Sequence, residues 1–76
     1  MDVKDFNEKL GQYLAECRGD ESQRRLSDRC GVQQSDISRY ENGITQPSVI
    51  TLYKMYCAMP NLDIISFFEM VSNDIF

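Results

Sequence analysis

Hydrogen-bonding side chains are concentrated in one short stretch of the chain, between residues 33 and 39. They are Gln33, Gln34, Ser35, Ser38 and Arg39. A glutamine amide can both donate to and accept from one edge of adenine, and an arginine guanidinium can donate twice to guanine. The apolar Ile37 and Tyr40 have the spacing of one helix face, which leaves the polar side chains on the other. The stretch is therefore chemically suited to reading base edges in DNA.

Two short helices around a glycine are expected to position this stretch. Ser22 is a good N-cap for a helix that runs to about residue 30. Gly31 supplies a tight turn, because glycine adopts a positive φ without steric cost. Residues 33–42 form the next helix, which ends at Asn42-Gly43, a typical left-handed stop. This helix-turn-helix layout leaves the second helix protruding, so that it can enter a major groove.

Three further helices are predicted outside this pair. The first has one apolar face and a capping box at Asp5 and Glu8; the face carries Phe6, Leu10, Tyr13, Leu14 and Cys17. The fourth opens at Pro47-Ser48, and its inward face is predicted to hold Val49, Leu52, Met55, Tyr56 and Met59. The fifth is capped by Asp63, and its apolar side chains are Ile64, Ile65, Phe67, Phe68 and Val71. No strand pattern is present. We expect residues 1–76 to form a single all-α domain of five helices, with the motif at about 22–42.

The motif also resembles a known family. The matching pieces are Ser22-Gln23-x-x-Leu26-Ser27, Gly31-Val32-x-x-Ser35-x-Ile37-Ser38-Arg39-Tyr40-Glu41-Asn42-Gly43 and Pro47-Ser48-x-x-x-Leu52. These pieces resemble the lambda-repressor-like (Cro/C1-type, Xre) helix-turn-helix domains of phage repressors and small bacterial regulators. The resemblance implies a compact five-helix fold. It also implies a sequence-specific transcriptional regulator. The expected form is a repressor that binds an inverted repeat of double-stranded DNA as a homodimer.

The resemblance assigns roles to individual residues. Gln23 would hydrogen-bond a phosphate and brace Gln34. Gln33, Gln34 and Ser35 would lie at the leading end of the recognition helix, with Arg39 one turn later. Main-chain amides from Asn42 and the following loop, Gly43 to Gln46 with Thr45 in its middle, would meet the opposite strand. Glu41 would pair with an arginine on the first helix, for which Arg18 is the candidate.

Several of these residues have a second interpretation. Arg39 either reads guanine or forms a surface ion pair with Asp36 or Glu41. Arg24 and its neighbour Arg25 either contact phosphate or are simply solvated. Ser27 stands where the family has alanine, so its hydroxyl needs a partner, for which the carbonyl one turn back is the candidate. Asp36 lies on the recognition helix, where phosphates repel it unless it accepts from cytosine or points aside.

The charge of the chain raises an alternative function. The net charge is −4, whereas affinity for nucleic acid normally depends on basic side chains. Residues 17–46 hold five arginines and five acids, and the excess acid lies in the two flanks. An acidic body weakens non-specific DNA binding and makes affinity depend on specific contacts. The alternative is a protein-interaction module of antitoxin or anti-repressor type built on the same fold.

Self-association is predicted at the end of the chain. One of the adjacent Phe67 and Phe68 should face the core, and the other should form an apolar patch with Ile75 and Phe76. This patch, together with the tail at residues 70–76, is the expected homodimer contact. The alternative is a frayed terminus with a few apolar side chains.

Other classes of function have no support in the sequence. The chain has no histidine, and the spacing of Cys17, Cys30 and Cys57 fits no zinc motif. No glycine-rich phosphate loop is present, so neither an enzyme nor a cofactor is expected. The cysteines are expected to be reduced, with Cys57 the candidate for a reactive thiol. Apolar runs are too short to span a bilayer and the N-terminus lacks a secretory signal pattern, so a cytoplasmic location is expected.

Overall fold

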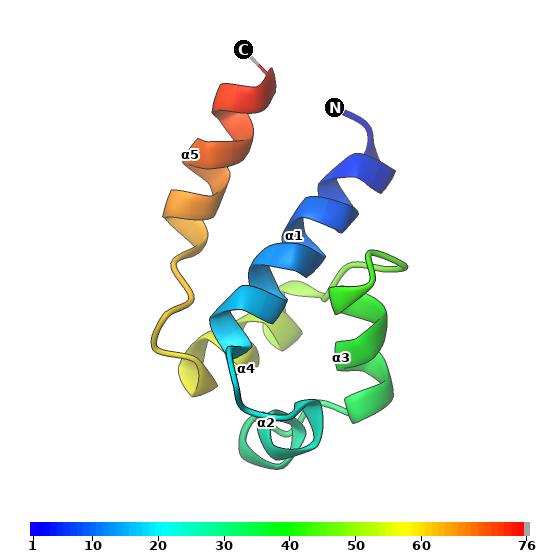
Figure 1. The fold of residues 1–76 in the computed structure, drawn as a ribbon, viewed down its shortest axis with the longest axis vertical. Helices are drawn as coiled ribbons and strands as arrows, with labels where there is room; N and C mark the ends of the chain where they lie inside the picture. Colours follow the sequence, from blue (N-terminus) through cyan, green and yellow to red (C-terminus); the bar gives the residue numbers. More distant parts are fainter. Residues whose placement is uncertain (76) are drawn as a thin grey trace.

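The computed structural model describes residues 1–75, and the side chains of residues 1–73 (Figure 1). The five helices are α1 (Val3–Arg18), α2 (Gln23–Cys30), α3 (Gln34–Glu41), α4 (Val49–Ala58) and α5 (Ile64–Ile75). No strand occurs in this part of the chain. The prediction of an all-α fold with five helices is confirmed.

Side-chain caps fix where most of these helices begin. The hydroxyl of Ser22 accepts from the Arg25 amide at 3.1 Å at the start of α2, and Ser48 starts α4 in the same way. Asp63 accepts from the Ser66 amide at 3.1 Å at the start of α5. The predicted capping box at Asp5 and Glu8 is wrong, because α1 begins one turn earlier. There Asp2 Oδ1 accepts from the Asp5 amide at 2.8 Å.

The hydrophobic core lies where α1 crosses the other helices. Its fully buried side chains come from all five helices and include Leu14, Leu26, Ile37, Met55 and Phe67. In Figure 1, α1 and α5 run side by side in the upper half, and α2, α3 and α4 surround the lower part of α1. The hydroxyl of Tyr13 on α1 joins this arrangement to α5, since it donates to the Asp63 carbonyl at 3.0 Å and accepts from the Asp63 amide at 2.8 Å.

Close packing of α1 on α3 requires a glycine. A Cβ atom on Gly11 would lie 2.7 Å from the carbonyl oxygen of Glu41 and closer still to that of Tyr40. Both contacts are with backbone, which cannot rotate away. Gly11 therefore sets the distance at which the end of α3 meets α1.

The structure corrects the predicted inward faces of α4 and α5. Val49 and Tyr56 were expected inside, but Val49 is 87% exposed and Tyr56 is 54% exposed. The side chains of α4 that reach the core are Met55 and Ala58, with Leu52 half-buried. Ile65 of α5 is likewise exposed. Helical periodicity marks an apolar face, but it does not say how much of that face a neighbouring helix covers.

The two adjacent phenylalanines divide as predicted, with one inside and one outside. Phe67 is 1% exposed and stacks on Tyr13 with ring centroids 5.1 Å apart. Phe68 is 46% exposed. Phe67 therefore cannot belong to a dimer surface, because its side chain fills the core. The predicted contacts of Ile75 and Phe76 lie outside the side chains that the structure describes.

Candidate nucleic-acid interface

The helix pair α2 and α3 is anchored by three buried apolar side chains. They are Leu26 of α2, Val32 of the turn and Ile37 of α3. Gly31 has φ 74°, as the tight turn requires. The hydroxyl of Ser27 donates to the carbonyl of Val32 across this turn rather than to the preceding helical turn, which corrects the predicted partner. The Ser27 hydroxyl thus has a partner and ties α2 to the turn that leads into α3.

The inner face of α3 is held in the core, and its outer face is open to solvent. Ile37 is fully buried and Tyr40 is half-buried. On the other side, Gln33, Gln34, Ser35 and Arg39 are exposed and Ser38 is half-buried. The structure therefore presents all five candidate base-contacting side chains from one short segment. Among the described residues, the side-chain amides of Gln33 and Gln34 form no hydrogen bond with another protein group.

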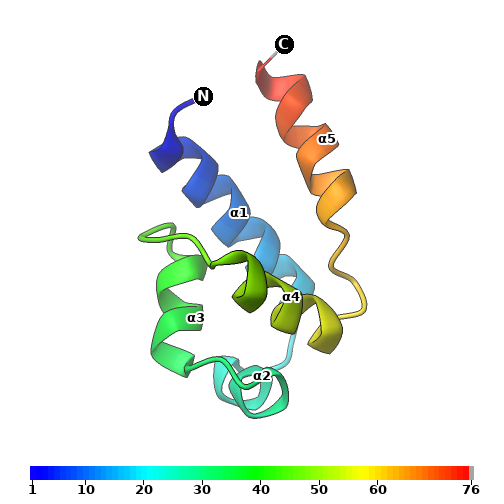
Figure 2. The same cartoon turned by 180° about the vertical axis from the view of Figure 1, so that it is seen from behind.

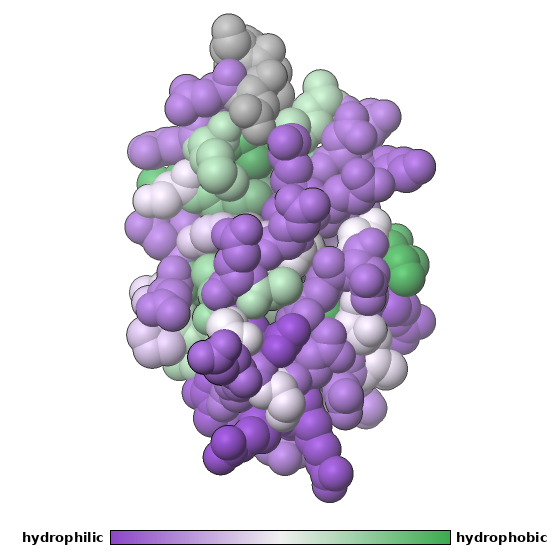
Figure 3. Space-filling view, viewed as in Figure 1, coloured by the Kyte–Doolittle hydropathy of each residue, from purple (hydrophilic) through white to green (hydrophobic). Residues whose placement is uncertain are grey.

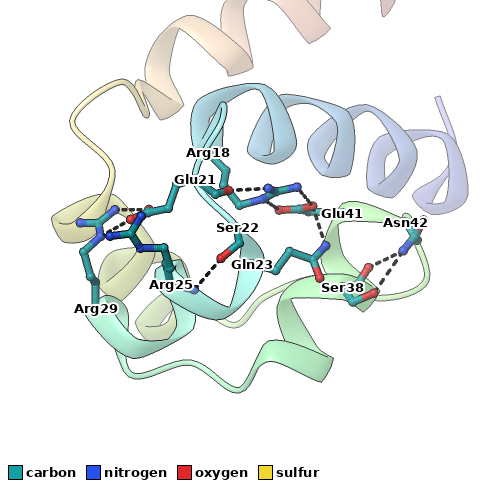
Figure 4. Close-up of polar contacts among 9 residues, drawn as sticks. All are labelled: Arg18, Glu21, Ser22, Gln23, Arg25, Arg29, Ser38, Glu41 and Asn42. Carbon is teal, nitrogen blue, oxygen red and sulfur yellow. Dashed lines mark hydrogen bonds and ion pairs between the residues drawn. The ribbon is translucent and has the colours of Figure 1, made fainter.

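A network of charged and amide groups fixes the carboxyl end of α3 to α1 and α2 (Figure 4). Arg18 Nε lies 2.7 Å from Glu41 Oε2, and Arg18 Nη2 lies 2.8 Å from Glu41 Oε1. Arg18 Nη1 also donates to the Glu21 carbonyl at 2.6 Å. The predicted pair of Arg18 and Glu41 is therefore present, with side chains that are 19% and 7% exposed. Hydrogen bonding to Glu41 raises the pKa of Arg18 above its ordinary value.

Gln23 belongs to this network rather than to the predicted pair with Gln34. Its Nε2 donates to Glu41 Oε1 at 2.9 Å. Glu41, at the end of α3, therefore accepts hydrogen bonds from two side chains on different helices, Arg18 of α1 and Gln23 of α2. In this arrangement the Gln23 side chain is held at the start of α2 before any ligand is present.

Arg29 of α2, for which the sequence predicted no contact, pairs with Glu21 ahead of α2 and also reaches α4. Arg29 contacts Glu21 through two hydrogen bonds, at 2.8 Å from Nε and 2.6 Å from Nη2. Arg29 Nη1 also donates to the Ala58 carbonyl at 2.6 Å, at the last turn of α4. These hydrogen bonds lower the pKa of Glu21 below its ordinary value. No local spacing signals this contact, because Glu21 precedes α2 and Ala58 lies in a later helix.

Asp36 points aside to Arg39 on the surface of α3. Arg39 Nη2 donates to Asp36 Oδ1 at 2.7 Å, and the two side chains are 54% and 37% exposed. This is one of the two interpretations that the sequence left open for each residue. The contact uses a single nitrogen of the guanidinium, so it orients Arg39 without occupying its whole donor edge.

The turn after α3 uses most of its own amides. The amides of Asn42, Gly43 and Ile44 donate to carbonyls of the last turn of α3, and Asn42 Nδ2 donates to the Ser38 carbonyl at 2.8 Å. Gly43 has φ 72°, the left-handed stop that was predicted. The amides of Thr45 and Gln46 donate to no backbone carbonyl among the described residues. Of the predicted phosphate-binding amides, these two are available.

Comparison with known proteins agrees with this geometry. A helix-turn-helix family model matches residues 21–60, which is more than half of the chain. The chain belongs to this helix-turn-helix family. The family is the Cro/C1-type, or Xre, group of DNA-binding regulatory domains. The match covers α2, α3 and α4, and so includes the exposed polar face and the Gln23 and Glu41 side chains that support it, whereas Arg18 precedes it. A search of curated proteins gave no significant match.

No helix in the described part of this chain is long and apolar enough to cross a membrane. Its described residues include no cluster of three or more side chains that could hold a metal ion. Cys17 is buried, Cys30 is half-buried and Cys57 is exposed on α4.

Proposed function

We propose that this helix-turn-helix protein is a sequence-specific transcriptional repressor that binds an inverted-repeat operator as a homodimer. The observation that carries the proposal is the division of α3 into a buried and an exposed side. Ile37 is fully buried, whereas the polar side chains from Gln33 to Arg39 face solvent. A helix presented in this way fits the major groove of B-DNA. A cytoplasmic location is part of the proposal, because double-stranded DNA is the target.

The proposed base contacts come from the leading end of α3 and from Arg39. Their residues are Gln33, Gln34, Ser35, Ser38 and Arg39. Amide side chains suit adenine and the guanidinium suits guanine. Asp36 holds one nitrogen of Arg39 and so limits the directions in which the guanidinium can point. An oriented guanidinium loses less side-chain entropy on binding than a free one does.

The proposed phosphate contacts lie on both sides of α3. Gln23 and Arg24 are the first two residues of α2, and the N-terminus of a helix favours a negative phosphate. In the turn after α3 the proposed donor is the amide of Thr45, because the amides of Asn42 and Gly43, the other two predicted contacts, already donate to carbonyls of α3. These groups would place the helix in the groove but carry no sequence information.

The acidic flanks support specific rather than general DNA binding. At the N-cap and within α1 the exposed acids include Asp2, Asp5, Glu8 and Glu16. Their charge opposes approach to a polyanion at long range, and salt screens this repulsion over about 8 Å at physiological ionic strength. Binding then depends on the contacts that only the matching sequence provides.

A protein-interaction module of antitoxin or anti-repressor type is the second candidate. The net charge of −4 and the Asp36 carboxylate on α3 favour it, since both weaken attraction to phosphate. In this alternative the exposed side of α3 contacts another protein. The half-buried network around Glu41 has the same structural role in both cases.

Selection on random duplex DNA separates the two candidates. The purified protein is mixed with the pool at low and at physiological salt, and the bound DNA is sequenced. We expect an enriched inverted repeat that persists at physiological salt. Absence of enrichment at both salt concentrations would contradict the DNA-binding proposal and favour a protein partner.

A further inference from the structure

The outer face of α4 carries apolar side chains that no other described element covers. Val49 is 87% exposed, Tyr53 is 59% exposed and Tyr56 is 54% exposed. Their spacing of four and three residues places them in one row along the helix. We call these three residues the α4 row. The neighbouring Ile50 is also exposed. Apolar side chains gathered in this way on a small protein indicate an interaction site.

The α4 row borders a groove between α4 and the segment that leads into α5. In Figure 2, α4 lies in front of α1, and the connection to α5 leaves from the carboxyl end of α4. The groove has a volume of about 260 Å³ and is lined by Val49, Leu52, Tyr53, Tyr56, Leu62 and Ile64. Pockets for small molecules usually measure about 300–1,000 Å³ and place a few polar groups for orientation. This groove is smaller and lacks charged groups, so it suits side chains of a protein partner.

The charge distribution favours a second copy of the same chain as that partner. Two copies that each carry −4 repel each other. The repulsion is weakest where acids are absent, and α4 has no acidic residue. Its one cation, Lys54, lines a separate hollow with Arg29 and Cys57 rather than the groove. By contrast, the face shown in Figure 3, with α4 behind, is mostly hydrophilic.

The exposed area fits a weak dimer. A buried aromatic side chain covers about 150–250 Å², and more than half of each tyrosine is exposed. With Val49, Ile50 and the groove lining, the face offers roughly 500 Å² per copy by the same measure. Two copies would bury about 1,000 Å² in total, which is at the low end for specific interfaces. Such a dimer would be weak in solution and stronger when both copies are on one DNA molecule.

We propose that the α4 row and its groove form the homodimer interface of this protein. A second copy places its own α4 row against the groove about a two-fold axis, so that the same residues contact each other from both sides. Tyr53 and Tyr56, with ring centroids 6.5 Å apart, are the anchoring side chains. The interface is an alternative to the contact through the fifth helix and tail that the sequence predicts. It rests on the proposed function only for its purpose, which is to hold two copies of α3 at a fixed separation.

Sedimentation equilibrium in the absence of DNA tests the interface. The samples are the full chain, the Tyr53→Glu variant and the Phe68→Glu variant, whose substitution is on the exposed face of α5. We expect the unchanged chain to dimerise. Tyr53→Glu should raise the dimer dissociation constant about thirty-fold or more, as expected for a tyrosine anchor. Phe68→Glu should leave it within about two-fold, as expected outside an interface. Circular dichroism checks that each variant folds.

If Tyr53→Glu loses helicity, Val49→Glu takes its place. Val49 is at the first turn of α4, where an acidic side chain is favourable to the helix. A chain that is monomeric at the highest soluble concentration would overturn the interface. The interface would also be overturned if Phe68→Glu weakened the dimer as much as the α4 substitution does.

The same samples distinguish this inference from the proposed function. A dimer that depends on the α4 row but selects no DNA sequence would uphold the interface and contradict the repressor proposal. A chain that selects a DNA sequence but stays monomeric without and with that DNA would overturn the interface and would uphold only the sequence-specific DNA binding of the proposed function.

Discussion

The guanidinium of Arg18 and the carboxylate of Glu41 meet edge to edge through two hydrogen bonds, across 23 residues of sequence. The pair joins the last turn of α1 to the last turn of α3. Because Gln23 donates to the same carboxylate, the start of α2 is held as well. One acidic side chain thus fixes three helices around the exposed side of α3.

Glu41→Gln should destabilise the fold substantially. The neutral amide leaves the guanidinium of Arg18, which is 19% exposed, without a compensating charge. We expect a loss of about 2–4 kcal/mol in the free energy of unfolding, slightly less than for a fully buried pair. Urea denaturation followed by circular dichroism measures it. The matched control is Asp36→Asn, which breaks an exposed pair and should cost less than about 1 kcal/mol. Equal losses would contradict the special role of Glu41.

Gly11→Ala should disturb the packing of α1 on α3. The new methyl group would press on the backbone carbonyls of Tyr40 and Glu41, and neither can move without shifting α3. The cost expected for such overpacking is about 1–3 kcal/mol, although alanine is the better helix former. Thermal unfolding measures the change. Gln12→Ala, at the next and exposed position of α1, should be close to neutral. A stabilised Gly11→Ala variant would show that α1 and α3 are not in close contact.

The ion pair of Glu21 and Arg29 should make stability depend on acid pH. Hydrogen bonds from Arg29 lower the pKa of Glu21 below its ordinary value of 4.5. A carboxylate with a lowered pKa in the folded state stabilises the fold fully above its unfolded pKa, and loses this contribution as the pH falls toward the folded value. The difference in melting temperature between the unchanged chain and Glu21→Gln should therefore be constant from pH 7 to about pH 5.5 and shrink below about pH 4.5. A difference that grows on acidification would have the wrong sign.

Arg39→Ala should weaken binding to the selected operator and relax its sequence preference. We expect a loss of about 1–3 kcal/mol, concentrated at one base pair of each half-site. Arg24→Ala is the comparison, because a lost phosphate contact weakens binding to all sequences alike and reduces the salt dependence. Titrations with the operator and with single-base variants give both numbers. If Arg39→Ala lowers the affinity equally for all sequences, Arg39 contacts a phosphate rather than a base.

Much of the fold was predictable because its signals are local. Ser22, Gly31 and Gly43 mark helix boundaries through their own backbone and side-chain chemistry, and the structure places boundaries there. The capping of α1 was misplaced by one turn because both Asp2 and Asp5 are suitable caps. Local chemistry alone does not choose between them.

The candidate site was predictable in composition but not in its contacts. Helical spacing puts the polar side chains from Gln33 to Arg39 opposite Ile37, and they are exposed. The partner of Gln23, however, is Glu41 rather than Gln34. The contact of Arg29 with Ala58 depends on how α2 meets α4. Such contacts between distant residues need the packed structure.

The sequence by itself determined the helices, the turn between α2 and α3, and the polar character of one side of α3, because these follow from periodicity and from the φ angles that glycine allows. The tertiary structure decided which apolar faces are covered. Val49 and Tyr56 have the spacing of core residues, yet they are exposed, because the core covers a different side of α4, that of Met55 and Ala58. Coverage depends on the placement of neighbouring helices, and the sequence of a single helix carries no record of that placement.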